Sequence, residues 1–131
     1  MKYYNILCWQ RAFPYFPSDI KELVTSHLYS AVHQLSLNPE EMNICWLVPT
    51  RHSIIAQKFF GKVSELLERE IARQSYDGGW WPTWEWGQYP EACTIARKEW
   101  AGKITLDILL ALRQHERITH DGTFTATLKP L

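Results

Sequence analysis

The sequence has no excess of charge of either sign and no long apolar run. Its 131 residues carry 14 basic and 14 acidic side chains, for a formal net charge of +0. Nucleic-acid binders are usually basic, because phosphate neutralisation supplies much of their affinity, so neutrality argues against a nucleic-acid partner. No stretch approaches the ~18 consecutive apolar residues of a membrane-spanning helix, and no signal-peptide pattern follows Met1. We therefore expect a cytoplasmic protein without a membrane partner.

The sequence also lacks paired cysteines and histidines at metal-binding spacings. Its three cysteines, Cys8, Cys45 and Cys93, include no C-x-x-C pair, which indicates reduced and buried thiols. The five histidines show neither H-x-x-x-H nor H-E-x-x-H, and no glycine-rich phosphate loop is present. We expect no cofactor and no metal. Cys93, at the start of an expected helix, is the one cysteine worth testing as a nucleophile.

What the chain does contain is a globular composition in a single-domain length. Hydrophobic residues make up 46% and charged residues 21% of the sequence. These values predict one globular domain over residues 1–131, large enough to bury a core without a disulfide or a metal.

Three segments show the periodicity of amphipathic helices. Residues 18–35 begin at Ser18, a good N-cap, and residues 50–74 begin at Thr50, which we expect to cap the second helix. Residues 90–115 begin with Pro90 and carry a broad apolar face with Gly102 in the middle. Glycine costs about 1 kcal/mol against alanine inside a helix. Close packing at this glycine would explain it, so a homodimer formed through the helix around Gly102 is one expectation.

Three other segments favour strands. Residues 3–9 are rich in aromatic and branched side chains, and residues 42–48 form a short apolar run between turn signals, one of which is Asn38-Pro39. Residues 118–128 alternate polar and apolar positions around Asp121-Gly122, which fits a hairpin with a type I′ turn. The predicted order is β-α-β-α-loop-α-β-β. We therefore predict an α+β two-layer domain with three helices on one face of a small mixed sheet.

A tryptophan-rich loop separates the second and third predicted helices. Four of the seven tryptophans lie within residues 80–86. Adjacent rings must diverge and alternating rings point the same way, so at least one ring should be partly exposed. Tryptophan and tyrosine are enriched at binding hot spots. The candidate partner-binding residues are Trp80, Trp81, Trp84, Glu85, Trp86 and Tyr89.

Two other interpretations of this loop remain open. The rings could complete the core as a lid over the two neighbouring helices, or they could stack on a sugar or nucleobase. Stacking on bases normally accompanies a basic groove. The loop contains Asp77 and Glu85 but no lysine or arginine, which argues against nucleic acid here.

A second candidate site lies at the start of the second predicted helix. Thr50, Arg51, His52 and Ser53 would place two hydroxyls, a guanidinium and an imidazole at a helix N-terminus, where anions bind favourably. The simpler interpretation is that Thr50 is a plain cap beside exposed Arg51 and His52.

These features predict a protein that works by binding rather than by catalysis. The first hypothesis is a bacterial or phage protein, such as an immunity protein, an antitoxin or a phage-type inhibitor, that blocks an enzyme or assembly through the tryptophan-rich loop. The alternative is a small enzyme or ligand-binding domain acting on a phosphate- or carboxylate-bearing substrate. In that case Arg51, His52 and either His115 or His120 must meet in one pocket.

Overall fold

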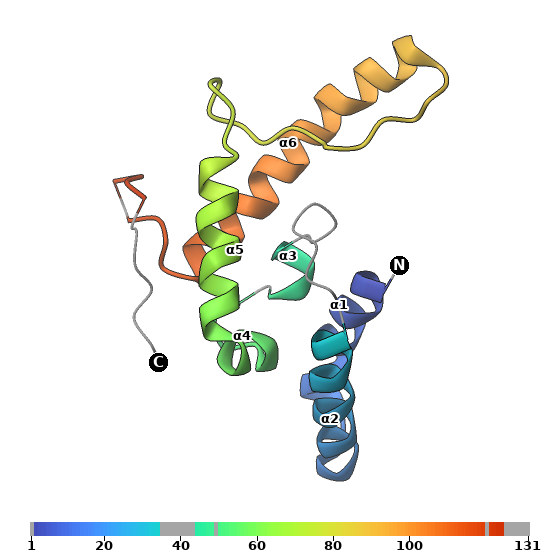
Figure 1. The fold of residues 1–131 in the computed structure, drawn as a ribbon, viewed down its shortest axis with the longest axis vertical. Helices are drawn as coiled ribbons and strands as arrows, with labels where there is room; N and C mark the ends of the chain where they lie inside the picture. Colours follow the sequence, from blue (N-terminus) through green and yellow to red (C-terminus); the bar gives the residue numbers. More distant parts are fainter. Residues whose placement is uncertain (1, 35–43, 49, 120, 125–131) are drawn as a thin grey trace.

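The computed structural model describes residues 2–34, 44–48, 50–119 and 121–124, and this part of the chain is helical (Figure 1). The elements are α1 (Lys2–Ala12), η1 (Phe13–Tyr15), α2 (Ser18–Gln34), α3 (Ile44–Leu47), α4 (Ile54–Lys58), α5 (Phe60–Ala72) and α6 (Pro90–Gln114). Over these ranges the only β-pairing is a single antiparallel bridge between Ile118 and Phe124. The predicted α+β fold with a mixed sheet is therefore wrong.

The two segments predicted as strands over residues 3–9 and 42–48 are helical instead where the structure describes them. Residues 3–9 lie in α1, where Ile6 and Leu7 are buried and Gln10 Nε2 donates to the Leu47 carbonyl at 2.6 Å. Ile6 and Gln10 are one helical turn apart, so both can face the core from the same side of a helix. The packing of this side against the rest of the fold outweighs the weak β-propensity of the segment. Residues 44–47 form the single turn α3. A short apolar run does not distinguish a strand from a buried helical turn.

The predicted hairpin is present only as a tight turn within the described residues. Thr119 N donates to the Thr123 carbonyl at 2.9 Å, and Gly122 has φ 84°. Gly122 therefore has the positive φ that a type I′ turn needs at its second central residue. The Asp121 carboxylate accepts a hydrogen bond from Thr123 N at 3.2 Å, as aspartate commonly does in turns. Residues 125–128 of the predicted hairpin, and the Asn38-Pro39 turn, lie outside the described part of the chain.

The long predicted helices are largely confirmed. α2 and α6 match the predictions over residues 18–35 and 90–115, and Pro90 begins α6. The helix predicted over residues 50–74 is interrupted at Phe59, which leaves α4 and α5 as separate elements. Its cap is Ser53 rather than Thr50, because the Ser53 hydroxyl accepts a hydrogen bond from Ala56 N at 3.1 Å.

The core forms where α3 meets α1, α5 and α6 (Figure 1). Its most deeply buried apolar members come from five separate segments: Val48, Ile55, Leu67, Trp80 and Leu112. Figure 1 shows α1 and α2 at one end of the molecule and α6 projecting at the other, with residues 80–89 running beside it. None of the helices in the described ranges combines the length and apolarity that crossing a membrane would need.

Candidate functional site

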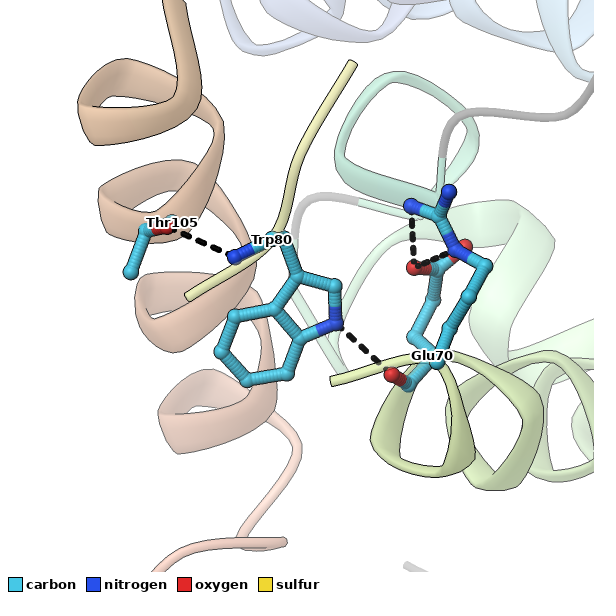
Figure 2. Close-up of polar contacts among 4 residues, drawn as sticks. Glu70, Trp80 and Thr105 are labelled. Atoms are coloured by element: carbon cyan, nitrogen blue, oxygen red, sulfur yellow. Dashed lines mark hydrogen bonds and ion pairs between the residues drawn. The ribbon is translucent and has the colours of Figure 1, made fainter. Parts of the chain in front are cut away.

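Trp80 attaches the tryptophan-rich loop to the core. Its side chain is completely buried, and the indole Nε1 donates to the Glu70 carbonyl in the last turn of α5 at 2.7 Å (Figure 2). Its backbone N donates to Thr105 Oγ1 of α6 at 2.9 Å. Trp80 thus joins α5 to α6, and its ring is not accessible to a partner.

The Glu70 carboxylate lies beside this anchor and is itself buried. Glu70 is 5% exposed, and its Oε2 accepts hydrogen bonds from Arg73 Nε at 3.2 Å and Nη2 at 3.0 Å (Figure 2). A buried carboxylate is costly unless it is paired and hydrogen-bonded. The Arg73 pair therefore allows the end of α5 to approach the indole closely.

The turn before Trp80 holds the next ring, Trp81. Asp77 Oδ1 accepts from Gly79 N at 3.0 Å, and Oδ2 accepts from Trp81 Nε1 at 2.9 Å. These bonds, led by the one from Gly79, hold the pKa of Asp77 below its ordinary value. Gly78 has φ 85°, which allows the chain to turn here. Trp81 is 39% exposed, yet the orientation of its ring is fixed.

Trp84 and Trp86 form a parallel stack further along the loop. Their ring centroids are 5.9 Å apart and their planes differ by 7°. Trp84 is half-buried, whereas Trp86 is 48% exposed. The stack agrees with the prediction that both rings point the same way, and it leaves the Trp86 ring open to solvent.

An arginine from α6 holds this part of the loop in place. Arg97 Nη1 lies 3.5 Å from Glu85 Oε1, and Nη2 donates to the Pro82 carbonyl at 3.3 Å. The negative charge of the loop at Glu85 is therefore offset by a residue that follows it in the sequence. Counting charges within the loop alone missed this partner.

Tyr89 occupies a strained backbone conformation. It is the N-cap of α6 with φ 52° and ψ 61°, in the left-handed region. That region costs a residue with a side chain roughly 1–2 kcal/mol. The Tyr89 ring is 68% exposed, so core packing does not compensate the strain. Strained residues of this kind cluster at functional sites.

The second candidate site, at Thr50–Ser53, is occupied by contacts within the chain. Arg51 forms an ion pair with Glu116, and Ser53 caps α4, which has only five residues. His52 is exposed, and its carbonyl accepts a hydrogen bond from Gln57 Nε2 at 3.2 Å. Thr50 is half-buried. These residues connect segments of the fold through contacts within the chain.

His115, the histidine proposed to complete that site, is a core residue. It is 1% exposed, and its Nε2 donates to the Val48 carbonyl at 2.8 Å, which fixes the neutral tautomer. Burial lowers the pKa of His115, and the nearby positive charge of Arg51 adds to this effect. His115 and His52 therefore do not meet at an exposed pocket. His120 lies outside the described residues.

A second buried polar group, near the end of α6, was not predicted from the sequence. The Arg117 side chain is fully buried and forms an ion pair with Glu68 of α5. Burial lowers the pKa of Arg117, and the ion pair offsets part of the desolvation cost. An arginine just after a helix end is usually solvated, so only the three-dimensional contact with α5 reveals this role.

Comparisons with family models, curated proteins and solved structures found no match to this chain. Within the described ranges, no three histidine, cysteine, aspartate or glutamate side chains gather as metal ligands would. The candidate site that the geometry presents is the exposed part of the tryptophan-rich loop. We call it the loop surface and define it as Trp81, Trp84, Glu85, Trp86 and Tyr89.

Proposed function

We propose that this protein acts by binding another protein through the loop surface. The observation that carries the proposal is that exposed aromatic rings are held in fixed orientations. Trp81 is bonded to Asp77, and Trp86 is stacked on Trp84. Rigid aromatic side chains supply a large contact area with little loss of conformational entropy on binding.

The strain at Tyr89 supports the same proposal. A glycine at this position would adopt the left-handed conformation without strain. The exposed tyrosine ring does not contribute to the core, so core packing does not explain its presence. A contact made only in a complex would explain why a tyrosine occupies this position, and it would also explain why Trp86 is exposed. Trp80, which the sequence placed among the contact residues, is excluded from them because it is buried.

The charge of the loop favours a protein over a nucleic acid as the partner. Asp77 and Glu85 are exposed acidic groups, and Arg97 is engaged by Glu85 and the Pro82 carbonyl. Binding to phosphates would require free cations near the rings. We propose that the partner is a cytoplasmic enzyme or assembly that the chain blocks by covering its surface, as immunity proteins, antitoxins and phage-type inhibitors do.

The test is an affinity capture that compares matched variants of the full chain. The double variant Trp86→Ala/Tyr89→Ala removes the two most exposed rings of the loop surface. The control is Tyr76→Ala, because Tyr76 is 104% exposed and lies outside that surface. Circular dichroism and the melting temperature check that each variant is folded.

We expect the wild type and the Tyr76→Ala control to capture the same protein from an extract of the cells that make the chain. A hot-spot ring contributes at least about 2 kcal/mol, or about thirtyfold in affinity, so the loss of both rings should weaken binding to the purified partner by several hundredfold, about 4 kcal/mol. If the purified partner is an enzyme, it should lose activity with the wild type and with Tyr76→Ala but not with the double variant. Equal binding by the folded double variant would contradict the proposal.

A further inference from the structure

The side of α6 that faces away from the core exposes several apolar side chains beside the charged Lys98 and Glu99. The buried side carries Cys93, Ala101, Ile108, Ala111 and Leu112. The opposite side exposes Ile95 at 62%, Leu106 at 58% and Leu109 at 36%. These three residues share one face, because intervals of eleven and fourteen residues are close to three and four helical turns. A solvated helix normally carries polar residues on such a face.

Gly102 lies at the centre of this face and is not explained by contacts within the chain. A Cβ at Gly102 would meet no described atom within 4 Å, and its backbone is not in the left-handed region. Alanine would therefore fit and would stabilise the helix by about 1 kcal/mol. A glycine here does allow the backbone of another helix to approach closely.

Four residues on this face form two pairs that are symmetric about Gly102, whereas the counterpart of Leu106 is the charged Lys98. Ile95 and Leu109 lie seven residues on either side, and Glu91 and Arg113 lie eleven residues on either side. We call the set the outer face and define it as Glu91, Ile95, Gly102, Leu106, Leu109 and Arg113. A surface that pairs with itself across a two-fold axis needs this kind of internal complementarity.

We propose that α6 packs antiparallel against α6 of a second copy of the chain, with the two-fold axis at Gly102. Ile95 then packs against Leu109 of the second copy, and Glu91 faces its Arg113. Neither Glu91 nor Arg113 forms an ion pair with the described part of its own chain, so both charges are available. Parallel pairing would instead place Glu91 against Glu91 and Arg113 against Arg113.

The position of α6 leaves room for this pairing. Figure 1 shows its N-terminal half extending past α5, with residues 80–89 running beside it. The loop is held by Arg97 and Thr105, which are not part of the outer face. The dimer therefore does not require the loop surface, and the proposed partner binding and the dimer can fail independently.

Sedimentation velocity on the full chain, from about 1 µM to about 300 µM, tests the pairing. An interface made by one helix from each copy buries an area at the small end of the range for specific protein–protein interfaces, so we expect a Kd in the micromolar range. Ile95→Glu should weaken dimerisation at least tenfold, because it places a charge against Leu109 of the second copy. Leu23→Glu is the matched control, because Leu23 is 67% exposed on α2 and lies outside the outer face. It should leave the Kd unchanged.

A charge exchange tests the orientation of the two helices. The two-fold axis creates two identical pairs of Glu91 with Arg113, and Glu91→Arg makes both of them repulsive. This change should therefore weaken the dimer about tenfold. Adding Arg113→Glu should restore the Kd to within about twofold of the wild type. A wild type that stays monomeric at every concentration, or a double variant that fails to recover, would overturn the proposal.

Disulfide trapping in a Cys8→Ser background gives a second readout of the same geometry. Gly102→Cys should form a covalent dimer, and a mixture of Ile95→Cys and Leu109→Cys chains should form a mixed one. Ile95→Cys alone should not, because the axis at Gly102 separates the two copies of this residue. Crosslinking of Ile95→Cys alone as efficiently as Gly102→Cys would overturn the antiparallel arrangement.

Discussion

Trp80 provides the most quantitative prediction about the loop. The side chain is completely buried between α5 and α6, and it makes one hydrogen bond through its indole. Replacing a buried tryptophan with alanine typically costs 3–5 kcal/mol, because the transfer free energy is lost and a cavity remains. Trp80→Phe keeps most of the ring but removes the donor to the Glu70 carbonyl. We expect it to cost about 1.5–3 kcal/mol, of which the lost hydrogen bond supplies about 1 kcal/mol.

Urea unfolding followed by circular dichroism measures these differences in the free energy of unfolding. Trp86→Ala is the comparison, because it removes the same side chain from the exposed half of the loop. It should cost no more than about 1.5 kcal/mol, the contribution of its stack on Trp84. If Trp80→Ala lies within 1 kcal/mol of the wild type, or costs less than Trp86→Ala, then Trp80 does not anchor the loop.

Three further predictions follow from titrating groups and strain. Because burial lowers the pKa of His115 below its ordinary 6.5, the unfolded state takes up the proton first. The free energy of unfolding should therefore fall as the pH drops below about 6.5, by up to about 1.4 kcal/mol per pH unit. His115→Gln should show a shallower fall, and parallel urea curves for the two proteins at pH 7.5 and 5.5 would contradict this. Burial raises the pKa of Cys45 to about 12, so this thiol stays protonated at pH 8. Iodoacetamide added to the folded chain at pH 8 should label exposed Cys8 and leave Cys45 unmodified, which mass spectrometry of the intact chain would show. Tyr89→Gly should raise the melting temperature, with a gain of about 0.5–1 kcal/mol from relieved strain, and a lower melting temperature would refute the assigned strain.

The sequence was most informative where its pattern was long. The stripes over α2 and α6 extend through several turns, so their period is unambiguous. Residues 3–9 and 42–48 are too short to separate a period of two from one of 3.6. Their helical state depends on contacts such as the Gln10 bond to Leu47, which joins residues far apart in the chain.

The candidate site was predictable only in outline. Adjacent Trp80 and Trp81 had to diverge, but which ring enters the core depends on Glu70 and Thr105, one on each flanking helix. The clamp by Arg97 likewise becomes visible only when α6 lies beside the loop. His115 and Arg51 were predicted as groups that could bind a substrate. In the structure His115 donates to the Val48 carbonyl and Arg51 pairs with Glu116.

The central claim is that the loop surface touches another protein while Trp80 holds it in place. Photo-crosslinking in living cells tests this most directly, with p-benzoylphenylalanine introduced in place of Trp86 or, as the control, in place of Tyr76. We predict one dominant crosslinked protein from position 86 that is absent at position 76. The same crosslinks from both positions, or none from position 86 in a folded chain, would contradict the claim.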